Sequence, residues 1–213
     1  MRTLVIETAT AACSVALLRD GVVIAERHEI ISRGHAERLI PMIAELPDQG
    51  RADHILVDCG PGSFTGVRVG LAAARGLAIG WGSEVAGYSS LAIVAAAAFR
   101  ADPALPALAV VLEGGHGEVF MQAFLSRPFA SDGAFRALPA RDALVALGTL
   151  PAIGNGIRHL AALDSGLDSG LDLRESLPRA ADAILLDPGF ATLDPRPIYG
   201  RAPDAMTLAE RMA

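Results

Sequence analysis

Residues 55–66 read ILVDCGPGSFTG and decide how the chain folds. The continuous apolar run Ile55–Cys59 is typical of a buried parallel strand. It leads through a glycine-rich turn into small residues that continue to about Ile79, where the pattern predicts a long helix. Ser63 or Thr65 can cap the start of that helix. The sequence therefore predicts a strand, a tight turn and a helix in direct succession.

The turn has two interpretations, and they can both hold. Its glycines permit backbone conformations that a side chain would forbid. Gly66, Gly70 and Ala74 repeat at a spacing of four, so one face of the helix lets another backbone approach closely. The amides at the helix start also suit an anion. However, the glycine spacing fits neither a dinucleotide fingerprint nor a hydrolase nucleophile elbow, and the lysine of a P-loop is missing.

The residues before this unit predict an antiparallel meander. Three short strand-like runs, Thr3–Glu7, Cys13–Leu18 and Val22–Ile31, are joined by short turns. A helical period follows over Gly34–Leu46, where Pro41 should kink or break the helix. After the central unit come a strand, 85–88, and a helix that runs through residue 99.

A Pro-containing segment at residues 102–106 marks a boundary, and the order of elements then partly repeats. We expect helix over 178–191 with a break at Pro188, an acidic surface loop over 164–172, and extended chain over 194–199. Before these come strands at 107–112, 119–125, 134–138 and 152–153 and helices at 140–147 and 157–163. The predicted domains are residues 1–102, residues 103–205 and a C-terminal tail, 206–213.

Composition excludes several classes of protein. The chain has 213 residues, is 52% hydrophobic and 20% charged, and so is not intrinsically disordered. All 18 basic residues are arginine, which excludes chemistry that needs a lysine amine. The net charge of -6 disfavours binding of nucleic acid by this chain alone. The longest apolar run, Leu91–Phe99, is about half of a membrane span. Two cysteines make no disulfide framework, so we expect a cytoplasmic protein without membrane contact.

Several further stretches, in the right order and over nearly the whole chain, match the motifs of one family. Together with residues 60–70, GPGSFTGVRVG, they resemble the TsaB (YeaZ) family, which belongs to the bacterial machinery that makes threonylcarbamoyladenosine in tRNA. The stretches are residues 7–17 (ETATAACSVAL), 33–43 (RGHAERLIPMI), 89–91 (SSL), 117–120 (GEVF), 154–156 (GNG) and 197–205 (PIYGRAPDA).

The resemblance implies an α/β protein with the two-lobed fold of actin, sugar kinases and Hsp70, each lobe a mixed β-sheet with helices. It also implies a non-catalytic scaffold that activates and dimerises with the catalytic subunit TsaD, alongside the ATPase TsaE. TsaD holds a metal through a His-x-x-x-His pair, and the matching positions here are Ser90 and Val94. We therefore expect no catalytic and no metal-binding residue, and we expect tRNA to be held chiefly by partners.

The partner surface should include the helices over Gly34–Leu46 and Thr65–Ile79. Because the helix over Thr65–Ile79 has so few charged residues, it must be covered by its own fold or by another chain. The same surface suits a homodimer when the partner is absent. The residues expected at the interface are His35, Leu39, Met42, Gly66, Val67, Gly70 and Ala74.

An enzyme is the alternative function, either a nucleotide-dependent phosphotransferase or a glycoprotease-like hydrolase. Glu7 stands where phosphate-contacting folds of this type place an Asp near magnesium, although it can instead cap the turn at Thr8–Ala12. Glu113, His116 and Glu118 form the best cluster elsewhere, at an expected hairpin tip. A vestigial site for ATP and magnesium would comprise Glu7, Thr8, Gly60, Gly62 and Ser63.

Overall fold

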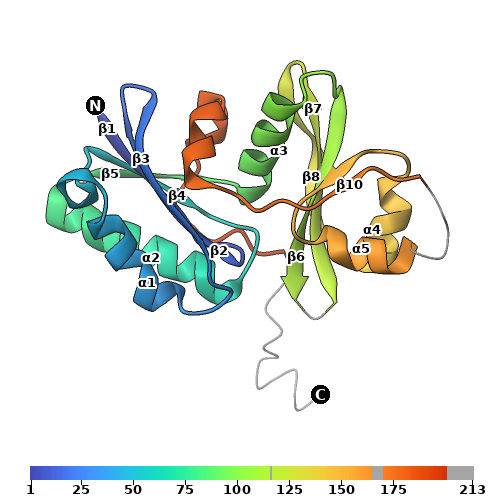
Figure 1. The fold of residues 1–213 in the computed structure, drawn as a ribbon, viewed down its shortest axis with the longest axis horizontal. Helices are drawn as coiled ribbons and strands as arrows, with labels where there is room; N and C mark the ends of the chain where they lie inside the picture. The colour runs from blue at the N-terminus through green and yellow to red at the C-terminus, as the bar shows by residue number, and fades with distance from the viewer. Residues whose placement is uncertain (116, 165–169, 201–213) are drawn as a thin grey trace, which may run out of the picture.

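The computed structural model describes residues 1–115, 117–164 and 170–200, which form two lobes side by side (Figure 1). Each lobe is built on a five-stranded mixed sheet, and the order in the N-terminal lobe is β3-β2-β1-β4-β5. Its elements are β1 Arg2–Glu7, β2 Ala12–Arg19, β3 Val22–Ile30, α1 His35–Ala44, η1 Pro47–Gly50, β4 His54–Asp58, α2 Phe64–Trp81, β5 Glu84–Tyr88 and α3 Ser90–Ala101.

Helices cover both faces of the N-terminal sheet. The first three strands form the predicted meander, and β4 and β5 extend it in parallel. Because side chains alternate across a strand, Leu4 and Ile6 of β1 pack in one cluster with residues of α1 and α2. Val5 faces the other side and packs with α3. In Figure 1, α1 and α2 lie together below the sheet.

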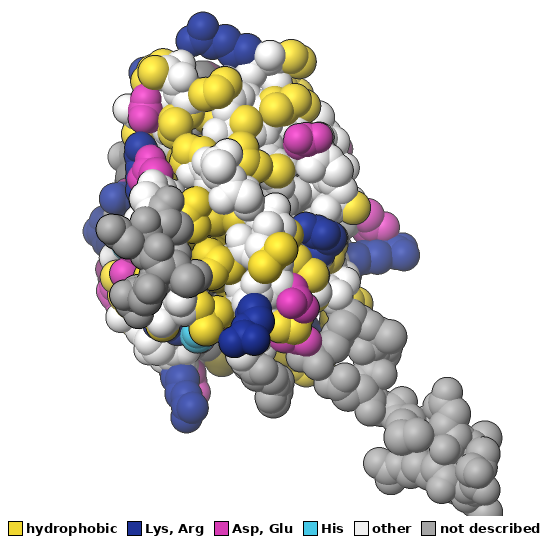
Figure 2. Space-filling view, turned by 90° about the vertical axis from the view of Figure 1, so that its right-hand side faces the viewer, with side chains coloured by type: hydrophobic (Ala, Val, Ile, Leu, Met, Phe, Trp, Pro, Cys, Tyr) yellow, Lys and Arg dark blue, Asp and Glu magenta, His cyan; other side chains and the backbone are white. Residues whose placement is uncertain are grey.

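The C-terminal lobe has the strand order β10-β9-β6-β7-β8. Leu108 and Val110 of β6 pack with α3, whereas Ala109 and Val111 pack with α4 and α5. Seen end-on in Figure 2, this lobe carries apolar side chains among charged ones, and Val145 of α4 is 79% exposed. Its elements are β6 Ala107–Gly115, β7 Glu118–Ser126, β8 Phe129–Pro139, α4 Ala140–Leu147, β9 Ala152–Ile153, α5 Ile157–Asp164 and β10 Leu173–Arg174.

The two lobes share a hydrophobic core around α3. Leu91 and Ile93 of this helix are fully buried, and they belong to one cluster with Val5 of the first lobe and Phe124 of the second. The longest apolar run of the sequence is therefore a core helix, as its length indicates. The shared core fixes the lobes against each other.

After β10 the chain returns to the N-terminal lobe. The Arg179 side chain pairs with Glu26 at 2.6 Å, and the Ala180 amide donates to the Ser14 hydroxyl at 3.0 Å. The predicted second domain, 103–205, therefore includes a segment that packs on the first lobe, because order along the chain does not show where a segment docks. Its two helices are η2 Ala180–Leu185 and η3 Pro188–Phe190, and residues 201–213 lie outside the described residues.

The glycine-rich turn packs against the turn that follows β1. A Cβ atom at Gly62 would overlap the Ala9 carbonyl, and one at Gly66 would overlap the Thr8 carbonyl. At Gly70 the added atom would meet the Thr8 hydroxyl. The packing interpretation of the turn is confirmed, and its anion-binding interpretation stays a prediction.

Local structure differs from expectation at four places. Pro41 lies inside α1 without ending it, because the carbonyl that loses its partner, that of Glu37, is on an exposed residue. Two short 3₁₀ helices replace the helix expected over 178–191. The short strand β10 and the start of β8 at Phe129 were not predicted. Residues 165–169 of the expected acidic loop lie outside the described residues.

Two glycines of α2 provide a matched test of this packing. We expect Gly66→Ala to lower the free energy of unfolding by about 1–3 kcal/mol, because the new methyl group has no room. Gly76→Ala should raise it by about 0.5–1 kcal/mol, since a Cβ at Gly76 meets nothing within 4 Å and alanine favours the helix. Urea unfolding of both variants measures the difference, and equal effects would contradict the packing.

Candidate functional site

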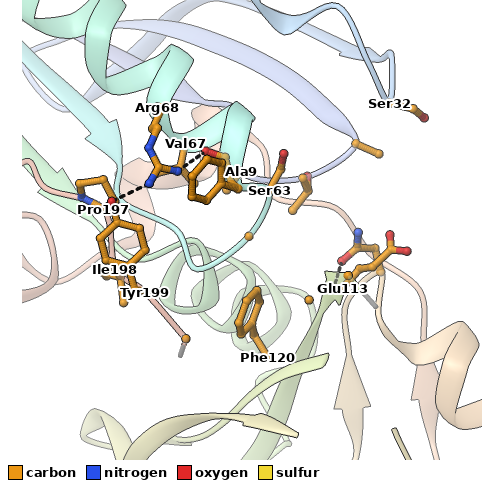
Figure 3. Close-up of a pocket in the computed structure, with 18 of the residues that line it drawn as sticks. Ala9, Ser32, Ser63, Val67, Arg68, Glu113, Phe120, Pro197, Ile198 and Tyr199 are labelled. Atoms are coloured by element: carbon orange, nitrogen blue, oxygen red, sulfur yellow. Dashed lines mark hydrogen bonds between the residues drawn. The ribbon is translucent and has the colours of Figure 1, made fainter. Parts of the chain in front are cut away.

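A cleft of about 900 Å³ lies between the lobes (Figure 3). Sites for small molecules commonly have this size and lie at such junctions. Three walls line the cleft. The first wall comes from the N-terminal lobe and contains residues 9–11, 32, 62–64, 67 and 68. The second comes from the C-terminal lobe, with residues 113–115, 120, 155 and 158, and the third is the returning chain, residues 197–200.

The first wall is shaped by hydrogen bonds of the glycine-rich turn. The Ser63 amide donates to the Ala9 carbonyl at 2.6 Å. The Ser63 hydroxyl caps α2 by accepting from the Gly66 amide at 3.1 Å, as the sequence predicts. The start of α2 is thereby held at the cleft.

Arg68 is fixed in place on this wall. Its guanidinium lies 3.3 Å from the ring centroid of Phe64 and 5.3 Å from that of Tyr199. It donates to the Phe64 carbonyl and to the Tyr199 hydroxyl, each at 2.7 Å (Figure 3). Such stacking and bonding orient a guanidinium before any ligand arrives.

The second wall places charged side chains at the end of β6. The Glu113 carboxylate pairs with Arg158 at 2.5 Å and lies 3.5 Å from the His159 ring. The Asn155 side-chain carbonyl accepts from the Glu113 amide at 3.1 Å. The partners of Glu113 therefore come from the loop and helix after β9. His116, the histidine of the predicted cluster, lies outside the described residues.

Most of the residues predicted to bind a nucleotide do not reach the cleft. Glu7 and Thr8 are fully buried, and Gly60 is buried beside them. Only Gly62 and Ser63 line the cavity. The reason is the close packing of α2, which covers the ends of β1 and β4.

Glu7 holds the turn after β1 instead. Its carboxylate accepts from the Ala9 amide at 2.9 Å, and the Tyr88 and Ser90 hydroxyls lie 3.1 Å from its Oε2. The turn-capping interpretation of Glu7 is thereby confirmed. Burial, and then the neighbouring Asp58, raise the pKa of Glu7 well above its ordinary value.

Asp58 is a buried carboxyl group that sequence reasoning missed. Its Oδ2 accepts from the Thr8 amide at 2.8 Å and lies 3.1 Å from the Thr8 hydroxyl, which also donates to the Gly66 carbonyl at 2.8 Å. Burial raises the pKa of Asp58 to about 7. The signal in the sequence was an acidic residue within the otherwise apolar run Ile55–Cys59, at the last position of β4.

The residues present do not fit a magnesium–ATP complex. The carboxylate that such folds place near the metal is here Glu7, whose bonds all go to groups inside the lobe. The carboxylate that lines the cleft, that of Glu113, is already paired with Arg158. We therefore derive no step through this cofactor.

The seven residues predicted for the partner interface face the interior. Leu39, Met42 and Val67 are at most 5% exposed, and the His35 ring donates to the Ala12 carbonyl at 3.1 Å. The glycine and alanine members face the turn after β1 and the sheet. This corrects the prediction: side chains chosen for helical spacing lie on the face that packs on the chain's own sheet. The residues are His35, Leu39, Met42, Gly66, Val67, Gly70 and Ala74.

A different face of α2 reaches solvent. We call it the α2 ridge and define it as Thr65, Ala72, Gly76, Ile79 and Gly80, all of which are exposed and none of which is charged. Ile79 is 87% exposed, and Cβ atoms at the two glycines would meet nothing within 4 Å.

Comparison with known proteins bears on this site. The family model described as TsaD, tRNA N6-adenosine threonylcarbamoyltransferase, matches residues 23–130, just over half of the chain. The chain belongs to this family. A TsaB protein named for tRNA threonylcarbamoyladenosine biosynthesis, from Escherichia coli, is 42% identical over 125 residues, covering 56% of this chain and 53% of that protein. The Haemophilus influenzae TsaB is 38% identical, with coverages of 61% and 56%.

Solved structures agree with this assignment. YeaZ from Pseudomonas aeruginosa superposes with a TM-score of 0.76 at 28% identity, over 93% of this chain and 99% of that one. The resemblance to the TsaB (YeaZ) family is therefore confirmed. The ethanolamine utilization protein EutJ from Carboxydothermus hydrogenoformans, with a TM-score of 0.51 at 14% identity over 90% and 89%, shares the fold. The predicted actin-like fold is confirmed too. The chain spans about half the length of the curated relatives it matches.

Among residues 1–115, 117–164 and 170–200, no helix is long and apolar enough to cross a membrane. The same residues contain no group of three His, Cys, Asp or Glu side chains that could hold a metal ion.

The buried carboxyl groups predict a stability that falls as pH rises. The ordinary pKa of an aspartate is about 3.9, and that of Asp58 in the folded chain is about 7. At pH values between these two, the folded state binds more protons than the unfolded state. Stability should drop by up to about 1.4 kcal/mol per pH unit for each such group in this window. Urea unfolding measured from about pH 5 to pH 8 should show that the free energy of unfolding of Asp58→Asn falls less steeply with pH than that of the parent chain.

Asp132→Asn is the matched control, because Asp132 is exposed on β8. This variant should keep the slope of the parent chain. If Asp58→Asn kept it as well, the raised pKa of Asp58 would be contradicted.

Proposed function

We propose that this chain is a non-catalytic activating subunit of the machinery that makes threonylcarbamoyladenosine in tRNA, and that it pairs with a TsaD-type catalytic subunit. Membership of this family supports this role, and so do the TsaB relatives, which are named for tRNA threonylcarbamoyladenosine biosynthesis. The structural observation that carries it is the α2 ridge.

The α2 ridge has the properties of a helix-docking surface. It lacks charge, and its glycines let a neighbouring helix approach closely. Ile40 of α1, 48% exposed, and Pro41 lie on the adjacent helix and extend the apolar surface. A stable interface of ordinary size buries about 1,600 Å² in total. A partner helix laid along α2 and α1 would supply that contact.

The interior of the N-terminal lobe supports the non-catalytic part of the proposal. Ser90 and Val94, which match the metal-binding histidines of TsaD, are 0% and 2% exposed. Ser90 bonds to Glu7, and Val94 belongs to the core shared by the lobes. These positions serve the fold and do not face the cleft.

The roles of the other components complete the proposal. With a net charge of -6, this subunit would leave tRNA binding chiefly to its partners. ATP hydrolysis would belong to TsaE, as the family resemblance implies. A cytoplasmic location follows from the tRNA substrate. A homodimer through the α2 ridge is the alternative state when the partner is absent.

Substitutions on the α2 ridge test the pairing. Gly76→Trp places a large side chain where close approach is needed, so we expect at least about a hundred-fold weaker binding of the TsaD-type subunit. Calorimetry and light scattering after size exclusion measure it. Val145→Asp, on the opposite lobe, is the control and should bind normally. Normal binding by Gly76→Trp would count against this surface, and ATP hydrolysis by the isolated chain would overturn the non-catalytic role.

A further inference from the structure

The chain segment Leu193–Gly200, here called the strap, is built into the surface of the N-terminal lobe. Leu193 and Gly87 exchange two backbone hydrogen bonds, of 2.7 and 3.0 Å. The Ile198 amide donates to the Cys59 carbonyl at 2.8 Å, and the Ile198 side chain packs in the N-terminal core. The strap is therefore a fixed part of that lobe, although it follows the second lobe in sequence.

Both arginines of α2 hold the strap. Arg75 donates to the Pro195 carbonyl at 2.7 Å, and Arg68 donates to the Tyr199 hydroxyl at the same distance. Arg68 lies about one turn before Ala72 of the α2 ridge, and Arg75 lies about one turn before Ile79. The α2 ridge thus has α1 on one flank and the strap on the other.

A rigid aromatic cluster stands exposed where the strap meets the cleft. Phe64 is 70% exposed and Tyr199 is 58% exposed, and the Arg68 guanidinium lies over both rings, 3.3 Å from the centroid of Phe64 and 5.3 Å from that of Tyr199. Tyrosine, arginine and other aromatic anchors dominate the binding energy of protein interfaces. Side chains already fixed in place lose little entropy when a partner binds. The cluster has the composition and the rigidity of an interface anchor.

The charges around the cluster favour an acidic partner group. Arg68 uses two of its five N–H donors for the Phe64 carbonyl and the Tyr199 hydroxyl. Across the cleft, Arg158 is paired with Glu113, so that pair is neutral overall. Among the described residues that line the cleft, the charge left outside this pair is the positive charge of Arg68.

We infer that the Phe64–Arg68–Tyr199 cluster is a second contact site for the partner that docks on the α2 ridge. The partner inserts an acidic side chain flanked by apolar residues at the mouth of the cleft. This inference rests on the proposed function, because the cluster is continuous with the α2 ridge along one helix.

Affinity measurements with the full chain and the TsaD-type subunit test it. The double variant Phe64→Ala/Tyr199→Ala should weaken binding by about ten-fold or more, while the backbone hydrogen bonds of Leu193 and Ile198 still hold the strap on the N-terminal lobe. Val145→Ala, which truncates an apolar side chain that is 79% exposed on α4, should leave the affinity unchanged. Arg68→Met, which keeps the long stem and removes the charge, should reduce the dependence of affinity on salt concentration.

The outcomes separate this inference from the proposed function. If Gly76→Trp abolishes binding while the double variant binds normally, the α2 ridge stands and the second contact site is overturned. If the unmodified chain does not bind the TsaD-type subunit, the proposed function fails. An unchanged salt dependence in Arg68→Met overturns the acidic partner group. If the double variant loses affinity for tRNA but keeps its affinity for the TsaD-type subunit, the cluster binds RNA and the inference is overturned.

Discussion

The first two turns of α2 lie directly on the turn that follows β1, and the rest of the N-terminal lobe is arranged around this contact. Gly62 and Gly66 bring the two backbones together. The Thr8 hydroxyl joins them by donating to the Gly66 carbonyl, and Asp58 accepts from the Thr8 amide. No side chain larger than hydrogen fits at these glycines. The position of α2 is thereby fixed relative to the sheet.

The same contact decides which residues can have a functional role. It covers Glu7 and Asp58, which therefore act as hydrogen-bonding groups of the interior. It also turns the opposite face of α2 to solvent, where the α2 ridge offers a surface without charge. One face of α2 packs small residues against the interior, and the opposite face exposes small residues to solvent. Together these two faces explain why α2 carries so little charge.

The strap adds a second constraint, because it ties the end of the described chain to the first lobe. Arg68 and Arg75 interrupt an otherwise uncharged helix, and both hold the strap. Together with the core around α3, the strap makes the cleft a fixed cavity. A partner on α2 would meet α1, the strap and the mouth of the cleft on one continuous surface.

The sequence by itself determined most of the strands, the glycine turn, α2 and the family, because alternation, small-residue spacing and local motifs are properties of neighbouring residues. It also indicated that one face of α2 allows close approach. Only the tertiary structure decided that Gly66, Gly70 and Ala74 face the chain's own sheet while Gly76 and Gly80 face solvent, since helical spacing defines faces without saying what covers them. The pairing of Arg68 with Tyr199, 131 residues apart, depends on a segment returning to a lobe that order along the chain does not reveal.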